Sequence, residues 1–121
     1  MVKKITTLFV IVALPGCQKA NTKYAPDFDL KAFNEISHGD RIEVVVNKIG
    51  YPLRIEKIDQ AKGSTQELEI SSKSTLAFDD RGSVYIMSYS LQMNGKRDFE
   101  RFSIAVKDRV VVASNHEIVT E

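Results

Sequence analysis

The sequence has little cysteine, little histidine and almost no net charge, and its apolar runs are short. Of its 121 residues, one is cysteine and two are histidine. The longest apolar stretch, residues 5–14, is about half of the roughly 20 residues that a membrane span requires. A single cysteine excludes an internal disulfide. Basic and acidic residues number 17 and 16, so the charge does not indicate a nucleic-acid-binding protein or one held to anionic lipid.

The first seventeen residues have the pattern of an export signal. Lys3 and Lys4 precede the apolar run, and Gly16 follows it, directly before Cys17. A basic head, a short apolar run and a small residue at the cut are the features of a secretory signal peptide. We therefore expect residues 1–16 to be removed, which leaves 15 basic and 16 acidic residues because two lysines leave with the signal.

The end of this segment, Leu14-Pro15-Gly16-Cys17, resembles the lipobox of bacterial lipoproteins. The resemblance implies cleavage between Gly16 and Cys17, and attachment of diacylglycerol to the thiol. Two or more acyl chains hold a protein stably on a membrane. Gln18 is not the aspartate that commonly retains such proteins in the inner membrane, so the resemblance implies the periplasmic face of the outer membrane. The alternative is a plain secretory signal followed by a stray thiol.

The mature chain is expected to contain a tether and one domain. Residues 17–26 are polar after the cysteine and lack apolar periodicity, which is typical of a lipidated flexible tether. Residues 27–121 are long enough for a single small domain.

Two short helices are expected at the start of this domain. Leu30, Phe33 and Ile36 recur at threes along one helical face, and Asp27 or Asp29 can cap that helix. It is expected to end at residues 37–39.

The second predicted helix covers residues 40–49. Asp40 and Glu43 have the spacing of a capping box, and Gly50 followed by Pro52 is a typical helix end. The alternative is a buried strand, because β-branched residues favour strands. One helical face would carry Ile42, Val45, Val46 and Ile49.

The same segment resembles a motif of the SmpA/OmlA (BamE-like) family of small outer-membrane lipoproteins. Two glycines eleven residues apart and a Gly-x-Pro ending keep the spacing of that motif, although Asp40 and Arg41 replace its Met-Thr pair. The resemblance implies two helices followed by a strand meander, and a subunit that supports outer-membrane protein assembly or envelope maintenance. The matching positions, for which it implies structural roles, are Gly39, Asp40, Val45, Ile49, Gly50 and Pro52.

Residues 53–80 are the least determined part of the chain. Residues 53–58 and 67–70 alternate like half-exposed strands around a polar turn, and Leu76 to Phe78 suggest another short strand. The segment is either an extra hairpin or a mobile loop.

The last third predicts an antiparallel meander. One strand places Tyr85, Met87, Tyr89 and Leu91 on one face, while Ser88 and Ser90 are expected to point the other way. Asn94-Gly95 is a strong hairpin signal, and Lys107-Asp108 suggests a second turn. The predicted last strand, residues 109–113, is apolar on both sides, so we expect it to be either central or covered on both faces. The predicted fold class is therefore α+β: two N-terminal helices packed on one face of a C-terminal antiparallel meander of at least three strands, in two layers.

No catalytic group is indicated. His38 and His116 lie far apart without metal-ligand spacing, so we expect solvent-exposed bystanders and no metal. Asp79 and Asp80 stand beside Arg81-Gly82 as turn residues, although paired carboxylates also serve acid–base chemistry. There is no nucleophile elbow and no phosphate loop. We expect a non-enzyme without a cofactor other than the lipid on Cys17.

Two functions fit these expectations. The first is a non-catalytic binding or scaffold module that is held at the membrane by its lipid and contacts an envelope protein, not nucleic acid. For this function we expect contacts at Gly50 to Arg54 and at exposed strand edges, which can recruit another strand. The alternative is a periplasmic inhibitor or immunity-type protein that binds a single enzyme. The sequence does not determine the oligomeric state.

Overall fold

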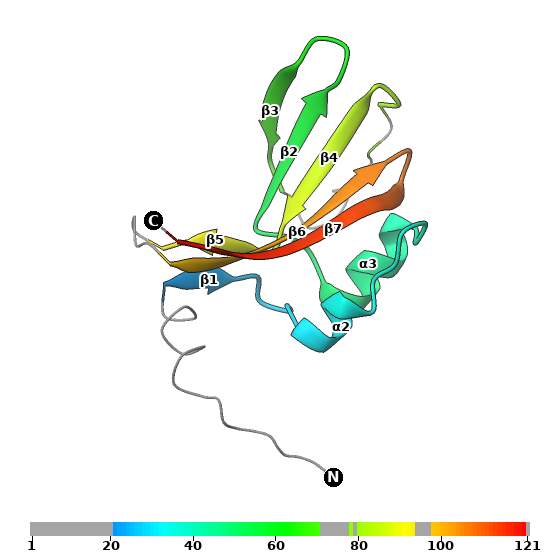
Figure 1. The fold of residues 1–121 in the computed structure, drawn as a ribbon. Coiled ribbons are helices and arrows are strands. Elements are labelled where there is room, and N and C mark those ends of the chain that lie inside the picture. The colour runs from blue at the N-terminus through cyan, green and yellow to red at the C-terminus, as the bar shows by residue number, and fades with distance from the viewer. Residues whose placement is uncertain (1–20, 71–77, 79, 94–97, 121) are drawn as a thin grey trace.

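The protein is a mostly β structure with two short helices beside the sheet (Figure 1). The computed structural model describes residues 21–70, 78, 80–93 and 98–120. None of the helices in these ranges is long and apolar enough to cross a membrane. The elements are β1 (Thr22–Tyr24), α2 (Leu30–Asn34), α3 (Ile42–Ile49), β2 (Arg54–Asp59), β3 (Ser64–Leu68), β4 (Ser83–Ser88), β5 (Ser90–Gln92), β6 (Phe99–Lys107) and β7 (Val110–Val119).

The predicted two-layer α+β fold with two N-terminal helices is wrong. Strand β1 precedes both helices, and the helices have only five and eight residues. Five antiparallel strands form the main sheet in the order β3-β2-β4-β6-β7, and β1 pairs with β5 in a second, two-stranded sheet. The sequence of β1, Thr-Lys-Tyr, carries no apolar alternation. Its strand conformation therefore comes from pairing with β5, because β propensity depends strongly on context.

Both predicted helices exist, although the first ends at Asn34, before Ile36, and one cap differs from the prediction. In α2 the Asp29 carboxylate accepts a hydrogen bond from the Ala32 amide at 3.1 Å, which confirms this residue as the cap. The helical pattern of residues 42–49 is confirmed over the strand alternative. The capping box is wrong, because the first turn of α3 receives no side-chain bond from its cap residue, Arg41.

The two residues of the predicted capping box make other contacts. The Asp40 carboxylate accepts a hydrogen bond from the Ser37 amide at 2.8 Å, within the turn before the helix. Glu43 forms an ion pair with Arg109, in the turn directly before β7, and lies 3.3 Å from Arg41. The hydrogen bond from Arg109 holds the pKa of the Glu43 carboxyl below its usual range. Glu43 therefore joins α3 to the sheet.

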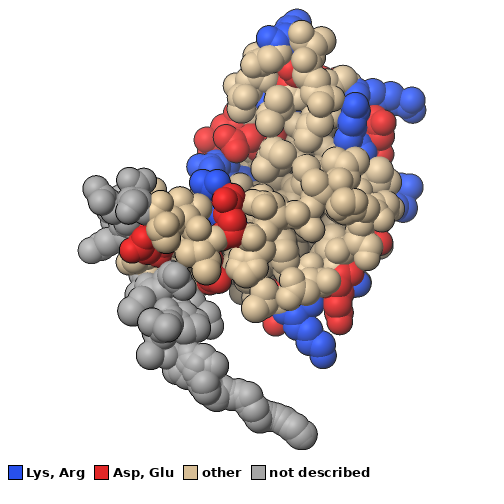
Figure 2. All heavy atoms as spheres, viewed as in Figure 1, with Lys and Arg blue, Asp and Glu red and all other residues tan. Residues whose placement is uncertain are grey.

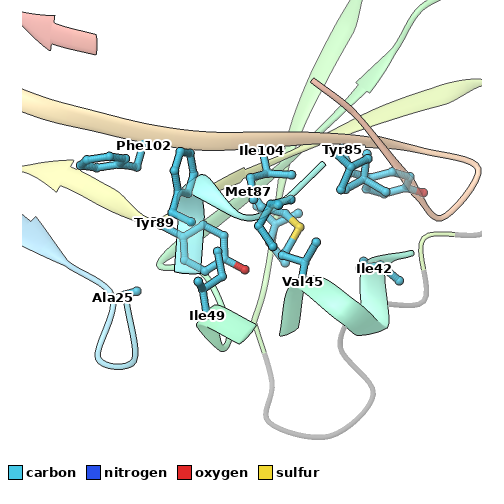
Figure 3. Close-up of a cluster of buried hydrophobic side chains, with 14 of the residues drawn as sticks. Ala25, Ile42, Val45, Ile49, Tyr85, Met87, Tyr89, Phe102 and Ile104 are labelled. Carbon is cyan, nitrogen blue, oxygen red and sulfur yellow. The ribbon is translucent and has the colours of Figure 1, made fainter. Parts of the chain in front are cut away.

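The buried face of α3 and one face of the sheet form a single core (Figure 3). Ile42, Val45 and Ile49 of α3 lie in one cluster with Met87 and Ile104 of the sheet. Burial of such aliphatic side chains stabilises a fold by about 1.5–3 kcal/mol each. The fourth residue of the predicted helical face, at position 46, is only half-buried.

Helix α3 ends at Gly50, whose φ of 76° is unfavourable for other residues. A Cβ atom at this position would lie 2.9 Å from the Cβ of Asp27. The Gly50 carbonyl accepts a hydrogen bond from the buried Tyr89 hydroxyl at 2.8 Å, and burial raises the pKa of that phenol. Gly50 thus closes the helix where the chain before α2 passes nearby.

The undetermined segment after α3 contains a hairpin. Strands β2 and β3 pair from Ile55–Leu68 to Asp59–Ser64, around a turn with Gly63 at a φ of 70°. Most of β3 is exposed, and β3 forms one edge of the main sheet. Residues 71–77, and with them most of the predicted short strand at 76–78, lie outside the described residues.

The predicted strand from Tyr85 to Leu91 is interrupted at Tyr89, between β4 and β5. After this interruption, the Ser90 hydroxyl and not a backbone group forms hydrogen bonds with the backbone of β6. It accepts a hydrogen bond from the Phe102 amide at 2.9 Å and donates one to the Glu100 carbonyl at 2.7 Å. Ser90 was expected to point away from the core face, yet it is buried at 2 % exposure because it completes the hydrogen bonds of β6.

Replacing Ser90 by alanine is expected to lower the free energy of unfolding by about 1–3 kcal/mol, because the Phe102 amide and the Glu100 carbonyl lose their partner in a buried place. Urea denaturation measures the change. The exposed Ser114 provides the matched control, since Ser114→Ala is expected to change the stability by no more than about 0.5 kcal/mol. Equal stability of both variants would contradict this role of Ser90.

The hairpin between β6 and β7 is confirmed, but its turn is shifted by one residue. Asp108 and Arg109 are the two turn residues, with φ values of 53° and 66°, and Lys107 pairs with Val110. Positive φ at both positions matches the twist of a two-residue hairpin. The other predicted turn, Asn94-Gly95, lies outside the described residues.

The prediction of a central or doubly covered strand at residues 109–113 is wrong. Strand β7 is the last strand of the main sheet, and Val112 is 42 % exposed. The register shifts opposite Ala105 and Val106, so that Val112 is an extra residue between the paired positions of β7. The β-branched run therefore lies at an edge.

Candidate functional site

The outer side of β7 is the candidate functional site. We call residues 112–118 of this strand the open edge. All seven are exposed, with Val112 and Ile118 as large apolar side chains at its two ends. Among the described residues, no strand pairs with this side of β7. Figure 1 shows the C-terminal end of β7 at the same end of the structure as β1 and β5.

The first part of the same side of β7 is covered by the chain itself. The Val111 amide donates to the Asp40 carbonyl, and the Val111 carbonyl accepts from the Gly39 amide, both at 2.8 Å. Arg41 forms an isolated antiparallel bridge with Val110. The turn before α3 therefore adds a short strand-like segment to β7, and the open edge begins where this segment ends.

The backbone of the open edge presents hydrogen-bonding groups outward. The Phe102 amide and carbonyl both face β5 and the residue before it, and Phe102 is paired with His116 of β7. The backbone amide and carbonyl of successive residues in a strand point to alternate sides of that strand. In an antiparallel pair of strands, when one residue points these groups away from the other strand, the residue paired with it does the same. The outward positions are therefore Ser114, His116 and Ile118.

One side-chain cluster spans β1, β6 and β7 behind this edge. Glu100 accepts a hydrogen bond from the Tyr24 hydroxyl and lies 3.2 Å from Nε2 of His116. The His116 ring stacks on Phe102 with the ring centroids 4.0 Å apart. Burial, and then the hydrogen bond to Glu100, raises the pKa of the Tyr24 phenol, so the phenol stays a neutral donor. This cluster fixes the position of the open edge.

A second group of polar side chains holds the open edge from its other face. Glu117 accepts hydrogen bonds from Asn115 and from Arg101 of β6, each at 3.0 Å. These two bonds hold the pKa of the Glu117 carboxyl below its usual range. The ionised carboxylate is exposed, so a partner strand would meet charged side chains here as well as the backbone.

The residues with possible chemistry do not form one site. His38 is exposed in the turn before α3. His116 contacts Glu100, so this histidine has a side-chain partner, which the sequence did not predict. Asp80 is a turn residue, as predicted: its carboxylate accepts from the Gly82 amide at 3.0 Å. It also pairs with Lys57 at 2.9 Å, and this contact lowers the pKa of the carboxyl. Asp79 lies outside the described residues.

No group of three or more side chains that could bind a metal is found in the part of the chain that the structure describes. This observation concerns only the described ranges, which do not include the single cysteine.

The residues that the family resemblance singles out have structural surroundings. Gly39 and Gly50 have positive φ, Val45 and Ile49 are fully buried, and Pro52 is buried. Gly16 and Cys17, the predicted cleavage and lipid-attachment residues, lie outside the described residues.

The predicted contact segment Gly50 to Arg54 is only partly accessible. Tyr51 is 38 % exposed, Leu53 is half-buried, and the Leu53 amide donates to the Ser88 carbonyl at 2.8 Å. The segment connects α3 to β2. Its backbone is therefore less available to a partner than that of β7.

The open edge could not be located from the sequence. The predicted strand stopped at Ala113, because Ser114 to Glu117 are polar and lack the apolar alternation of a half-buried strand. No local signal extends it, because these polar residues form a strand only through their pairing with β6. The contact between Glu100 and His116 depends on the register of the two strands, which the sequence does not show.

Comparisons with known proteins do not identify a relative. No family model, no curated protein and no solved structure matches this chain.

Proposed function

We propose that this protein is a lipid-anchored binding module on the periplasmic face of the outer membrane. In this proposal Cys17 carries the lipid, and the open edge of β7 accepts an extended segment of another envelope protein. The partner would belong to outer-membrane protein assembly or envelope maintenance, as the SmpA/OmlA resemblance implies. The lipobox-like sequence supports the anchor, and the geometry of β7 supports the mode of binding.

The observation that carries the proposal is that β7 already accepts added backbone. Residues 39–41 pair with its first part through hydrogen bonds of 2.8 Å. The following outward groups, at Ser114, His116 and Ile118, continue the same row. An exposed edge of this kind is a template for another strand, whose backbone hydrogen bonds provide affinity while alternate side chains provide specificity.

The surface gives further support for a protein partner. On the face shown in Figure 2, basic and acidic side chains are interspersed around the rim of a largely uncharged centre, and the described residues form no basic patch there. Proteins that bind nucleic acid concentrate basic residues on one face. The proposal assigns no catalytic residue, no metal and no cofactor other than the covalent lipid.

The proposal is tested by photo-cross-linking in cells from a reactive residue at Val112, with the same residue at Val44 on α3 as the control site. Both positions are exposed, at 42 % and 37 %. We expect a cross-link to a membrane-associated envelope protein from Val112 and none from Val44.

A pair of substitutions separates strand addition from general contact. Ser114→Pro removes one outward amide N–H, and an edge strand tolerates proline at such a position. This substitution is expected to reduce the yield of the cross-link at least about tenfold. Ser114→Ala keeps the amide and is expected to keep the cross-link. An unchanged yield with Ser114→Pro would contradict strand addition, and a single soluble enzyme as the cross-linked partner would favour an inhibitor or immunity-type protein instead.

A further inference from the structure

The folded part of the protein begins earlier in the chain than the sequence predicts, so fewer residues separate it from the proposed lipid on Cys17. Thr22–Tyr24, which the sequence places in the tether, forms β1 and pairs with β5. The next residue, Ala25, is buried at 3 % exposure. Asn21 already contacts the sheet, since its carbonyl accepts from the Met93 amide at 3.1 Å.

The remaining connection is short compared with the domain. Cys17 and Asn21 are four residues apart in the sequence (21 minus 17), so their Cα atoms lie at most about 14 Å from each other. A domain of about 100 residues has a radius of gyration of about 13 Å, so its diameter exceeds the length of this connection. A lipidated chain therefore cannot turn freely at the membrane, and the end of the molecule that carries Asn21 must stay close to it.

This end of the molecule also exposes apolar side chains. Met93 follows β5 and is 37 % exposed, and Ile118 near the end of β7 is 48 % exposed. Ile118 is paired with Glu100, whose amide donates to the Thr22 hydroxyl at 2.9 Å, so that β7 and β1 meet here through β6. Figure 1 shows the start of β1 and the end of β7 at the same end of the structure.

We propose that this end, formed by Asn21, Met93 and Ile118, rests on the surface of the lipid bilayer. The inference rests on the lipid anchor of the proposed function. The headgroup region of one leaflet is about 5–8 Å thick, so a connection of about 14 Å leaves little space between the bilayer and Asn21. Amphipathic contacts of this kind place apolar side chains in the headgroup region.

The orientation defines how a partner reaches the open edge. From Ile118 to Val112 is six residues, or about 20 Å of strand. With Ile118 at the bilayer, the open edge rises away from the membrane, and Val112 and the turn before α3 are its far end. A partner segment on this edge would then run between the bilayer and the periplasm.

The chain has no tryptophan, so a single tryptophan reports on one position. The test uses full-length lipidated protein, reconstituted in phosphatidylcholine vesicles with brominated acyl chains, and compares Ile118→Trp and Met93→Trp with Val44→Trp. All three positions are exposed, so the variants should fold. We expect tryptophan at 118 and 93 to be quenched at least about twofold more than tryptophan at 44.

Equal quenching at all three positions, or stronger quenching at 44, would overturn the orientation. Vesicle flotation, scored first, separates the two proposals: a protein that does not float with the vesicles contradicts the anchor itself, whereas a floating protein with equal quenching contradicts only the orientation. Insertion of ten Gly/Ser residues after Lys19 is expected to reduce the difference between 118 and 44. A difference unchanged by this insertion would contradict the short connection as its cause.

Discussion

Replacing Cys17 by alanine is expected to abolish fatty-acid labelling of the protein and its residence in the outer membrane. The acyl chains on this thiol are the only anchor that the account contains, because the apolar run before it is about half the length of a membrane span. Each buried methylene contributes about 0.8 kcal/mol to membrane binding. Loss of the diacylglycerol therefore removes far more affinity than contacts of Met93 or Ile118 could supply.

The measurement is growth with radiolabelled fatty acid, followed by membrane fractionation of the parent and of Cys17→Ala. The parent is expected to carry the label and to sediment with the outer membrane, and the variant is expected to do neither. A conservative control is Gln18→Asn, which keeps the thiol and a polar amide after it and should behave as the parent does. An exported parent that carries an unmodified thiol and remains soluble would contradict the anchor.

Replacing Phe102 by alanine is expected to have the largest effect on stability. Phe102 is 1 % exposed and is the centre of an aromatic cluster that includes Phe28 and Phe33, with ring centroids at 4.6 and 5.1 Å. It also stacks on His116 at 4.0 Å. Truncation of a buried phenylalanine costs about 3–5 kcal/mol, because the removed atoms leave a cavity.

A loss of this size is a large fraction of the total stability of about 5–15 kcal/mol for a small domain. Thermal unfolding should show a fall in Tm of at least about 12 °C. Val112→Ala is the matched control, since this side chain is 42 % exposed and should cost no more than about 0.5 kcal/mol. Similar Tm values for the two variants would contradict the central place of Phe102 in the core.

The sequence predicts those elements of the fold in which local signals agree. Ile42, Val45 and Ile49 share one helical face and are all buried in α3, so periodicity outweighed the strand preference of their neighbours. Asp29 caps α2 as its position suggests. The hairpin at the start of β7 also follows from its short polar turn, with a shift of one residue.

The elements that the sequence does not predict depend on partners far away in the chain. Strand β1 is a polar tripeptide that becomes a strand only beside β5, 68 residues later (90 minus 22). Ser90 lies between two apolar neighbours and therefore resembles an outward-facing residue, although its hydroxyl completes the hydrogen bonds of β6. These three-dimensional pairings change the fold from two layers of helix and sheet to a mostly β structure.

The candidate site illustrates the same limit. The proposed lipid attachment at Cys17 rests on a local motif of a few residues, whereas the open edge depends on which strand comes last in the sheet. The valine run of β7 indicated a covered strand, because the sequence shows side-chain type but not strand order. His116 gained its contact with Glu100 only through the register of β6 and β7.

The most direct test of the account is hydrogen exchange at the open edge in native membranes. Amide exchange of the peptide that covers residues 112–118 is measured in isolated outer membranes and again after purification of the lipidated protein in detergent. We expect this peptide to be protected in the membranes and to lose that protection on purification, while the exposed edge strand β3 exchanges equally in both. Equal exchange of residues 112–118 in the two preparations would contradict a partner strand on β7.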